Sequence, residues 1–595
     1  MKKIKNAKRI AALWLAGLLG CSGLVACGGG GGGTTSSSGG DTTSSSGSDD
    51  ITSSSGSDDI TSSSSEDITS SSSTSGSKEE KTILKVKVFN GGLGYEWLQE
   101  LANKFSEQFK DVSFEPGKKG VELKFTADKD FSSLYTKMAT GADKHDLYYT
   151  SDSNFYNFME SKVAYDVTDI MTEEVYDSDG YVQLAADGKS WKEQSKSIAD
   201  RITSEHIATR LNVGSEDDPQ YFALPFEDST AGIIVDWDLF KAKGWNNYNG
   251  IDGMPATIND FYNLLNRIRQ AGYSAFIYGT GVQYTRVIQD AVIAQVDGTE
   301  TYYDLFSDYT GEYDFNGDET ITEDEKITPA TAYKILDTKG VKAAVEMATK
   351  MFEKNSAGKT FYDPAVADGV EFGEAQQEFL MSVETTQPIA MLFEGEWWEN
   401  EARATFNAMG EDNPDYAYGK REFRMMPIPS FESTNEAQRY TLGAWTGGAC
   451  TIVNEKLVGD DEVKQEVLKL WLQYQYSTEG MKCFSKYTGA TLPIDYELSR
   501  TELKELTPFA QNMYALRKDD KYNVEVIYNG DSLRNEQIRK GGAQLSYNTE
   551  GYAGNVLFNL MLKRSKGNKM LTVEDYIVAM HAYQDQDIAD VYAED

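Results

Sequence analysis

Apolar and charged residues alternate over residues 84–88, and apolar residues alternate again over residues 121–125. An alternation with a period of two is typical of a strand. Between these stretches, a glycine-rich turn at 90–94 leads into apolar residues at helical spacing, namely Leu98, Leu101, Ala102, Phe105 and Phe109. Glu96 and Glu100 favour the positive amino end of that helix. The order strand, helix, strand predicts a βαβ unit and therefore a parallel sheet.

The same two periodicities recur along the rest of the chain. Residues 145–149 have the pattern of a further strand, which ends in the polar loop 150–154. Other strands are expected at 221–225, 231–235, 388–393 and 441–453, and amphipathic helices at 258–268 and 463–474. This succession predicts an α/β fold. Ligands of open α/β sheets lie beyond the carboxyl ends of the strands, where loops such as 150–154 are expected.

The chain begins with a basic head between Lys2 and Arg9, followed by an apolar run at 10–19. The run is too short to span a bilayer, so residues 1–26 are interpreted as a signal peptide. Leu-Val-Ala precedes Cys27, and a small residue followed by cysteine resembles the bacterial lipobox. In lipobox proteins the chain is cut before the cysteine, whose thiol carries diacylglycerol. The alternatives are ordinary cleavage after Ala26 and lipidation at Cys21.

Residues 27–81 consist almost wholly of Gly, Ser, Thr and Asp after the cysteine. A nine-residue unit at 44–52 repeats at 53–61, and a shorter, imperfect copy follows at 62–69. Such a segment buries too little apolar surface to offset its chain entropy, so a disordered linker is expected. About fifty flexible residues have a root-mean-square reach of roughly 40 Å. Lipidation would therefore tether a globular body to the extracellular face of the cell membrane, or to the periplasm of a cell with an outer membrane.

The body is long enough for two lobes. The whole chain contains 94 acidic and 57 basic residues, giving a formal net charge of −37. This charge argues against a nucleic-acid-binding role, because a basic face would be needed to neutralise phosphates. None of the three histidines lies in a metal or nucleophile motif, which disfavours a catalytic triad and a zinc enzyme. Cys450 and Cys483 could pair, and the sequence leaves this open.

The order of these segments resembles the extracellular solute-binding proteins of bacterial ABC importers, in particular their carbohydrate-binding, maltose-binding-protein-like group. The resemblance covers nearly all of residues 82–595. It rests on the opening at 86–109, the block at 221–240, the stretch 389–397, and the strand at 443–448 with its later partner at 488–493. It implies an α/β fold of two lobes, joined by hinge strands, with a ligand cleft between them. Lobe one would hold 82–168 and 442–492, and lobe two would hold 169–441 and 493–595.

The resemblance also implies a function. The protein would be a monomer that captures a carbohydrate, expected to be an oligosaccharide, and delivers it unaltered to a membrane permease. The alternatives are a lipid-anchored carbohydrate-active enzyme and a surface glycan-binding adhesin. Glu394 and Glu396 invite a paired-acid, glycosidase-like interpretation, but neighbours two apart on a strand point the same way and imply no facing partner.

A sugar site needs flat aromatic faces for C–H groups, and polar side chains for hydroxyls. The chain has 35 tyrosines and 9 tryptophans. Trp397 matches the Gly-x-Trp of the family, whose tryptophan stacks on sugar, although tryptophan is often a core residue. The other candidate ligand residues are Trp445, Tyr95, Asp152, Asn154, Glu227, Asp228 and Glu396. For Trp445 the alternative is a core position, and for Asp152 and Asn154 it is a solvated loop.

Residues 314–325 match the twelve-residue EF-hand loop. Oxygen ligands fall at Asp314, Asn316, Asp318 and Thr322, with the carbonyl of Thr320 and both carboxylate oxygens of Glu325. Glu319 replaces the glycine that the sharp turn of this loop prefers, at a cost in backbone strain. The pattern predicts a structural Ca²⁺ site away from the cleft, and the alternative is an acidic surface loop.

Overall fold

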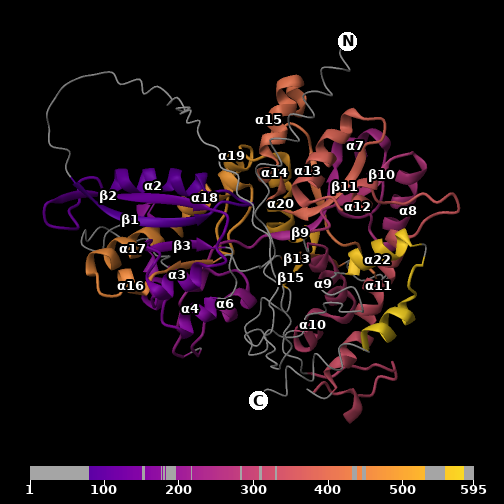
Figure 1. Ribbon diagram of the computed structural model, residues 1–595, viewed down its shortest axis with the longest axis horizontal. Coiled ribbons are helices and arrows are strands. Elements are labelled where there is room, and N and C mark those ends of the chain that lie inside the picture. The colour runs from indigo at the N-terminus through magenta and orange to yellow at the C-terminus, as the bar shows by residue number, and fades with distance from the viewer. Residues whose placement is uncertain are drawn as a thin grey trace, which may run out of the picture.

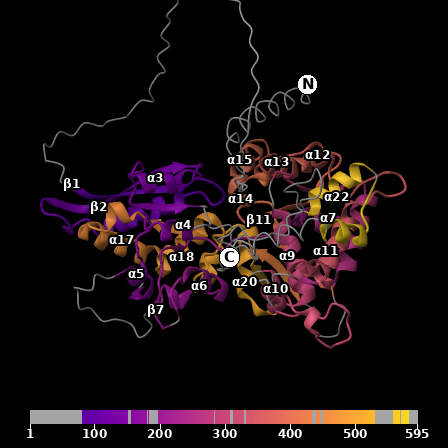
Figure 2. The ribbon, with the colours of Figure 1, turned by 60° about the horizontal axis from the view of Figure 1, so that its bottom comes forward.

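The computed structural model describes residues 80–150, 155–175, 177–178, 181–182, 196–215, 217–281, 284–306, 311–328, 331–431, 439–444, 450–528, 557–567 and 569–581. The predicted signal peptide, Cys27 and the linker up to residue 79 lie outside these residues. Within them, no helix has the length and apolar character needed to cross a bilayer. The elements form two lobes that lie side by side along the long axis of the molecule (Figure 1 and Figure 2).

Lobe one is built on a five-stranded sheet with the order β2-β1-β3-β14-β8. Its strands are β1 (Glu80–Phe89), β2 (Lys118–Asp128), β3 (Leu147–Thr150), β8 (Leu224–Pro225) and β14 (Cys450–Val453). β1 pairs in parallel with β2 and β3, and α2 (Glu96–Gln108) joins β1 to β2. The predicted βαβ unit is therefore confirmed.

The other helices of lobe one are α3 (Leu134–Thr140), α4 (Phe155–Glu160), α5 (Thr168–Thr172), α6 (Glu205–Leu211), α16 (Glu455–Val458), α17 (Glu462–Gln475) and α18 (Thr478–Thr488). Two short ladders pair β4 (Glu174–Val175) with β7 (Lys196–Ser197), and β5 (Asp177–Ser178) with β6 (Tyr181–Val182). Cys450 in β14 and Cys483 in α18 are both buried and are not joined to each other by a disulfide.

Lobe two contains a sheet with the order β10-β11-β9-β13-β15, and β12 also pairs with β9. Its strands are β9 (Thr230–Asp236), β10 (Ser274–Tyr278), β11 (Ile389–Gly395), β12 (Phe423–Met426), β13 (Tyr440–Ala444) and β15 (Val524–Tyr528). β9 runs antiparallel to β11 and β13, whereas β10 is parallel to β11 and β15 is parallel to β13. The start of β9 therefore lies at the same edge as the carboxyl ends of β10, β11, β13 and β15.

Helices cover both faces of this sheet (Figure 1). They are α7 (Trp237–Lys243), α8 (Ile258–Gln270), α9 (Tyr284–Asp297), α10 (Thr299–Phe306), α11 (Lys339–Phe352), α12 (Pro364–Asp368), α13 (Phe372–Met381), α14 (Trp398–Glu401), α15 (Arg403–Asp412), α20 (Pro508–Lys518) and α22 (Leu557–Lys566). The short helix α19 (Arg500–Leu503) lies on the connection between the lobes, where Glu502 pairs with Lys482 of α18. The helix expected at 258–268 begins after a capping box, in which Thr257 and Asp260 satisfy each other's backbone amides.

Helix α2 fixes the inner edge of lobe one. Its apolar face is fully buried, and the Trp97 ring packs edge-on against Phe484 of α18 with ring centroids 4.9 Å apart. Burying an aromatic side chain of this size stabilises a fold by about 1.5–3 kcal/mol. The chain turns from β1 into α2 at Gly92 and Gly94, whose φ angles of 37° and 66° are unfavourable for residues with a Cβ. The two glycines thereby permit the tight turn, and hydrogen bonds of Gly92 with Glu401 and Asn400 join it to lobe two.

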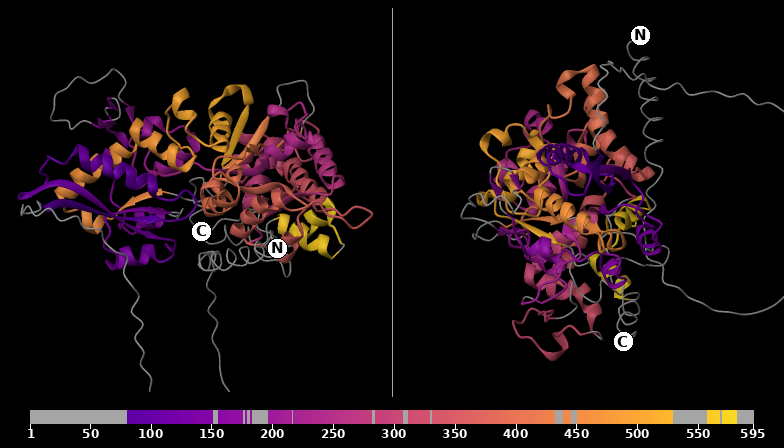
Figure 3. Two further views of the ribbon diagram at one scale, coloured as in Figure 1. Left: turned by 90° about the horizontal axis from the view of Figure 1, so that it is seen from above. Right: turned by 90° about the vertical axis from the view of Figure 1, so that its left-hand side faces the viewer.

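The described residues place three crossings between the lobes. The first runs from β8 to β9, and the second runs from β13 to β14 through residues 445–449, which the structure does not describe. The third follows Ile494, which bridges to Ile202 in lobe one, and precedes α20, which packs against β12. As Figure 3 shows, the orange segments after residue 450 consequently lie among the indigo segments of the N-terminal part.

The lobe boundaries differ from the predicted ones. The sequence pattern ends the first part of lobe one at 168, but β8 pairs with β14, so this lobe continues to Pro225. The strand expected at 221–225 is only two residues long. The second part begins after Ala444 rather than at 442, because Gly443 and Ala444 pair with β9 in lobe two. Apolar periodicity marks a strand but does not reveal which sheet the strand joins.

Candidate ligand site between the lobes

The sheet of lobe two brings three separate segments together at the edge that faces lobe one. Gly395 at the end of β11 and Gly443 near the end of β13 both pair with Ala231 at the start of β9. The Glu396 amide also donates to the Thr230 carbonyl across 2.9 Å. Residues that precede β9 therefore lie beside residues that follow β11. We call the resulting group, Glu227, Asp228, Glu394, Glu396, Trp397 and Glu401, the interlobe cluster.

Trp397 lies at the contact between the lobes and is only 5% exposed. Its ring covers Gly395 so closely that a Cβ at that position would overlap it, which explains the glycine of the Gly-x-Trp motif. The ring meets that of Tyr284, on α9, at a centroid distance of 5.1 Å and an interplanar angle of 63°. On its other side, a Cβ on Gly92 of lobe one would lie 3.4 Å from Trp397. Trp397 is therefore enclosed between two lobes rather than within the core of one.

Hydrogen bonds join the glycine turn of lobe one to α14 of lobe two. The Gly92 amide donates to Glu401 Oε1 across 3.0 Å, and Asn400 Nδ2 donates to the Gly92 carbonyl across 2.9 Å. Nearby, Arg403 Nη2 donates to the Tyr487 carbonyl across 3.3 Å. These contacts hold the two lobes together at the edge of the interlobe cluster.

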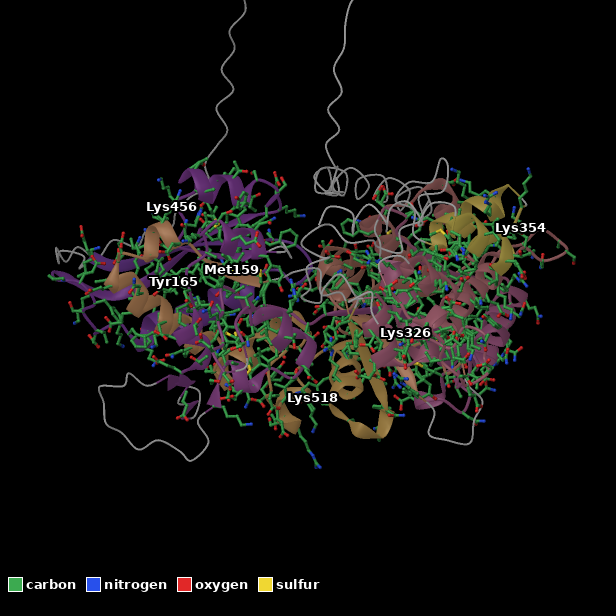
Figure 4. All side chains as sticks on the ribbon, turned by 90° about the horizontal axis from the view of Figure 1, so that it is seen from below. Met159, Tyr165, Lys326, Lys354, Lys456 and Lys518 are labelled. Atoms are coloured by element: carbon green, nitrogen blue, oxygen red, sulfur yellow. The ribbon has the colours of Figure 1, made fainter. Side chains whose placement is uncertain are left out.

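Asp228 is engaged by internal partners. Arg517, near the end of α20, contacts its carboxylate with Nη1 at 2.7 Å, and the Tyr528 hydroxyl donates to the same carboxylate at 3.1 and 3.2 Å. Asp228 is 3% exposed. Figure 4 places Lys518, the neighbour of Arg517, at the junction of the lobes. In this arrangement Asp228 fixes the first crossing, and its oxygens are already occupied.

Glu396 keeps one oxygen without a partner. Its Oε2 accepts from Thr230 Oγ1 at 3.2 Å and lies 3.7 Å from Arg517 Nε. Its Oε1 is buried and has no hydrogen-bond partner among the described residues. Burial raises the pKa of Glu396 to about 7, with the charge of Arg517 lowering it and that of Asp228 raising it.

Three further carboxyl groups border the same space. Burial raises the pKa of the partly exposed Glu227 to about 8, and the negative charges of Glu396, Asp228 and Glu401 add to this shift. Burial likewise raises the pKa values of Glu394 and Glu401, and in Glu394 the charge of Glu401 contributes as well. Gln376 Nε2 donates to Glu401 Oε2 across 2.8 Å. Glu394 Oε1 accepts the Gly395 amide at 3.0 Å, and hydrogen bonds from the side chains of Gln376 and Trp397 also act to lower the pKa of this carboxyl group.

The remaining predicted ligand residues either do not belong to the interlobe cluster or lie outside the described residues. Asp152, Asn154 and Trp445 lie outside the described residues. Tyr95 is partly buried at the start of α2, with its ring 6.5 Å from that of Phe125. Trp398 is fully buried in lobe two among Phe379, Phe406, Phe423 and Phe509.

The structure also adds residues that the sequence analysis missed, namely Tyr284, Arg517, Tyr528 and Glu401. Glu401 could have been found, because it lies one helical turn after Trp397. Arg517 and Tyr528 carry no local signal, since they reach the cluster only through the fold. Two cavities of about 270 and 300 Å³ lie beside α18 and α19 and contain none of the predicted ligand residues.

The EF-hand-like loop lies between α10 and α11 of lobe two, just before Lys326 in Figure 4. The Asp314 carboxylate accepts the amides of Gly317, Asp318 and Glu319. Glu319 has a φ of 63°, so it adopts the left-handed conformation for which the motif prefers glycine. Among the described residues, no group of three or more His, Cys, Asp or Glu side chains is arranged to hold a metal ion.

The loop is distant from the interlobe cluster. The Tyr313 hydroxyl, next to Asp314, donates to Asp297 Oδ1 across 2.7 Å. Asp297 is the last residue of α9, whereas Tyr284 at the cluster is its first. Thirteen residues of helix separate the two ends by about 20 Å.

No protein-family model and no curated protein matches this chain. Among solved structures, it is similar to a probable secreted solute-binding lipoprotein from Streptomyces coelicolor, at 12% identity and a TM-score of 0.51 over 85% of this chain and 100% of the other. It is also similar to the apo form of RafE from Streptococcus pneumoniae, at 13% identity and a TM-score of 0.50 over 86% and 99% of the two chains. RafE has also been solved in complex with raffinose. The chain therefore has the two-lobe α/β fold of solute-binding proteins, as predicted.

Proposed function

We propose that this protein captures a carbohydrate between its lobes and delivers it unaltered to the membrane permease of an ABC importer. The observation that carries the proposal is the interlobe cluster itself. Two aromatic rings and several carboxyl groups converge where the strand ends of lobe two meet the glycine turn of lobe one. This edge is where open α/β sheets bind ligands.

The chemistry of the cluster suits a sugar. When the lobes separate, the rings of Trp397 and Tyr284 would offer flat apolar surface to the C–H groups of a pyranose. Glu396 Oε1 is an acceptor whose burial favours a new donor, as a sugar hydroxyl would provide. RafE, which shares this fold, has been solved with raffinose, and an oligosaccharide is the ligand class that we propose here.

The remaining parts of the proposal concern the cell. Cys27 would carry the lipid anchor, and the linker would let the body reach the permease on the extracellular face of the membrane. The protein would act as a monomer and as a receptor rather than an enzyme. Ligand would shift an equilibrium between open and closed lobes toward the closed form.

Calorimetry and small-angle X-ray scattering with a panel of soluble oligosaccharides test this function. The expected result is saturable binding of at least one glycan with a decrease in the radius of gyration, and chromatographic recovery of the glycan intact. Cleaved products would establish the enzyme alternative, whereas binding to insoluble glycan without compaction would establish the adhesin. Either result would overturn the receptor proposal.

A pair of variants tests the site. Trp397→Ala is expected to weaken glycan binding at least ten-fold, because it removes the aromatic face between the lobes. Trp237→Ala is the control, since Trp237 is similarly buried, at 3% exposed, but packs on α7 against Phe240 and Arg424. Both variants lose stability, but only the first should lose affinity. Equal losses of affinity in both variants would show that Trp397 has no specific part in ligand binding.

We also propose that the loop 314–325 binds Ca²⁺ as a structural ion. Its oxygen donors suit this hard cation, and the backbone at Glu319 already has the left-handed conformation that the motif needs. At present Glu325 Oε2 accepts from the Thr322 amide and hydroxyl at 3.0 and 2.8 Å. An ion would compete for this carboxylate and for that of Asp314.

A further inference from the structure

A cavity of about 300 Å³ lies between the two lobes, next to the interlobe cluster. Lobe one lines it with Tyr487 and Gly489 at the end of α18, and lobe two lines it with Arg403, Tyr418 and Thr507. Helices α18, α19 and α20 meet at this junction in the middle of the molecule (Figure 1). A volume of this size is at the lower end of the range for ligand pockets, so it suits a single sugar residue.

Arg403 brings a cationic group with spare donors to the wall of this cavity. Its Nη2 donates to Asn400 Oδ1 across 2.7 Å, to the Tyr418 hydroxyl across 3.2 Å and to the Tyr487 carbonyl across 3.3 Å. All three acceptors are neutral groups. Arg403 Nε is buried and has no hydrogen-bond partner within the described ranges. Because a guanidinium carries five donor hydrogens, this arrangement leaves donors for a ligand.

The guanidinium of Arg403 is already held in one plane. It lies over the Tyr418 ring, 4.4 Å from the ring centroid, and its hydrogen bonds fix its rotation. A planar guanidinium matches the two oxygens of a carboxylate, with which it forms parallel charge-assisted hydrogen bonds. A side chain that is ordered before binding loses little conformational entropy when the ligand arrives.

The other charged groups nearby compensate Arg403 only in part. Lys486 pairs with Glu505 at 3.0 Å, and both side chains are more than half exposed, so water screens this pair. Glu399 does not line the cavity, and it accepts a hydrogen bond from the Thr507 hydroxyl. Burial raises the pKa of Glu399 to about 7, although the charge of Arg403 lowers it, so this carboxyl group is only partly ionised near neutral pH.

One side chain connects the cavity to the interlobe cluster. Asn400 accepts from Arg403 and donates to the Gly92 carbonyl across 2.9 Å, and Gly92 faces the Trp397 ring. Six residues of nearly continuous helix separate Trp397 from Arg403, which corresponds to a rise of about 9 Å. The cavity is therefore placed to hold a further residue of an oligosaccharide bound at the cluster.

We propose that this cavity is a second sugar subsite that selects an acidic residue, a hexuronate, whose carboxylate binds Arg403. The inference rests on the proposed carbohydrate-binding function and specifies its ligand class. A carboxylate accepts two hydrogen bonds from one guanidinium and neutralises its charge, whereas a hydroxyl brings no charge. The chain has a formal net charge of −37, so affinity for an acidic glycan requires a local cationic group of this kind.

Matched acids and esters test the proposal. Calorimetry at pH 7 would compare trimers of galacturonate, glucuronate and mannuronate with the methyl esters of the same trimers and with neutral hexose trimers of the same linkage. Methyl esterification keeps the sugar and the linkage but removes the charge. The expected result is that the acidic member of at least one series binds ten-fold or more tightly than its ester and its neutral counterpart.

Variants connect this preference to the cavity. Arg403→Gln removes the charge and should lower the ratio of acid to ester affinity at least five-fold. Arg403→Lys keeps a charge but loses the planar pair of donors, and it should lower the ratio at least two-fold. A purely structural role of Arg403 would weaken acid and ester equally, so the ratio distinguishes ligand binding from support of the lobe contact.

Arg267→Gln is the matched control in lobe two. Arg267 also lies over a tyrosine ring, that of Tyr248, and donates to the Asn247 side-chain oxygen and to a backbone carbonyl. Its replacement should leave the ratio unchanged. Circular dichroism and melting temperatures establish which variants are folded. An unchanged ratio in Arg403→Gln, or in Arg403→Lys if the first variant does not fold, would overturn the placement.

The outcomes separate the inference from the function on which it rests. Esters and neutral trimers that bind as tightly as the acids, or more tightly, would overturn the acidic subsite and leave the carbohydrate function intact. A panel in which no saccharide of any kind binds would overturn the proposed function, and the inference with it.

Discussion

Replacing Arg517 with Met should destabilise the junction of the lobes by about 3–5 kcal/mol at pH 8, which is the usual cost of removing one partner from a buried ion pair. The Arg517 side chain is 10% exposed and that of Asp228 is 3% exposed, so water cannot take over the lost contact at 2.7 Å. The variant also leaves Glu396 without the positive charge 3.7 Å away. Met fills a similar volume, so the effect of charge dominates that of packing.

The loss should depend on pH. Without Arg517 the pKa of Glu396, already raised by burial to about 7, rises further above that of the unfolded chain. A carboxyl group with a raised pKa costs stability only where it is forced to ionise, so the penalty is largest above this pKa and shrinks as the pH falls below 7. Urea unfolding followed by tryptophan fluorescence at pH 5.5 and 8 measures both values.

A double-mutant cycle with Asp228→Asn isolates the pair. The double variant should be more stable than the sum of the two single losses predicts, because neither partner is then left as a buried unpaired charge. A loss below about 1 kcal/mol for Arg517→Met at pH 8, or an equal loss at both pH values, would refute a buried ion pair at this position.

Further predictions concern other parts of the molecule. Gly92→Ala should weaken lobe closure and glycan binding several-fold, because its φ is 37° and a Cβ would meet Trp397; Gly117→Ala, with a φ of 83° and no atom nearby, is the control for backbone strain. Glu399→Gln should stabilise the protein above pH 7 relative to wild type and not below pH 5, because burial raises the pKa of Glu399 to about 7; equal effects at both pH values would count against it. Added Ca²⁺ should raise the melting temperature of wild type but not of the Asp314→Ala, Glu325→Ala variant, and an identical rise in both would remove the calcium site.

Much of the fold could be predicted from local pattern. Strand β1, helix α2 and strand β2 follow from the alternation at 84–88, the helical spacing after Gly94 and the alternation at 121–125. Helix α8 follows from its apolar face and its cap at Thr257. These elements are encoded by neighbours in sequence, and each is confirmed within a few residues.

The lobe boundaries and part of the site could not be predicted in this way. Pro225 belongs to lobe one only because β8 pairs with β14, which lies more than two hundred residues later in the chain. Arg517 approaches Asp228 across 289 positions of sequence, and no periodicity in α20 indicates that contact. Trp397 could be selected because its motif is short and local, whereas the pairing of charges around it depends on tertiary structure.

The direction of β1 has a mechanical consequence. Its carboxyl end enters the turn that touches α14, so its first residue, Glu80, lies ten residues back along the strand. At about 3.3 Å per residue, the predicted linker to the lipid anchor would join the body some 30 Å from the interlobe cluster. A force on the membrane anchor would therefore act on β1, an inner strand of the lobe-one sheet. Lobe two would not be restrained by the anchor and could move relative to lobe one.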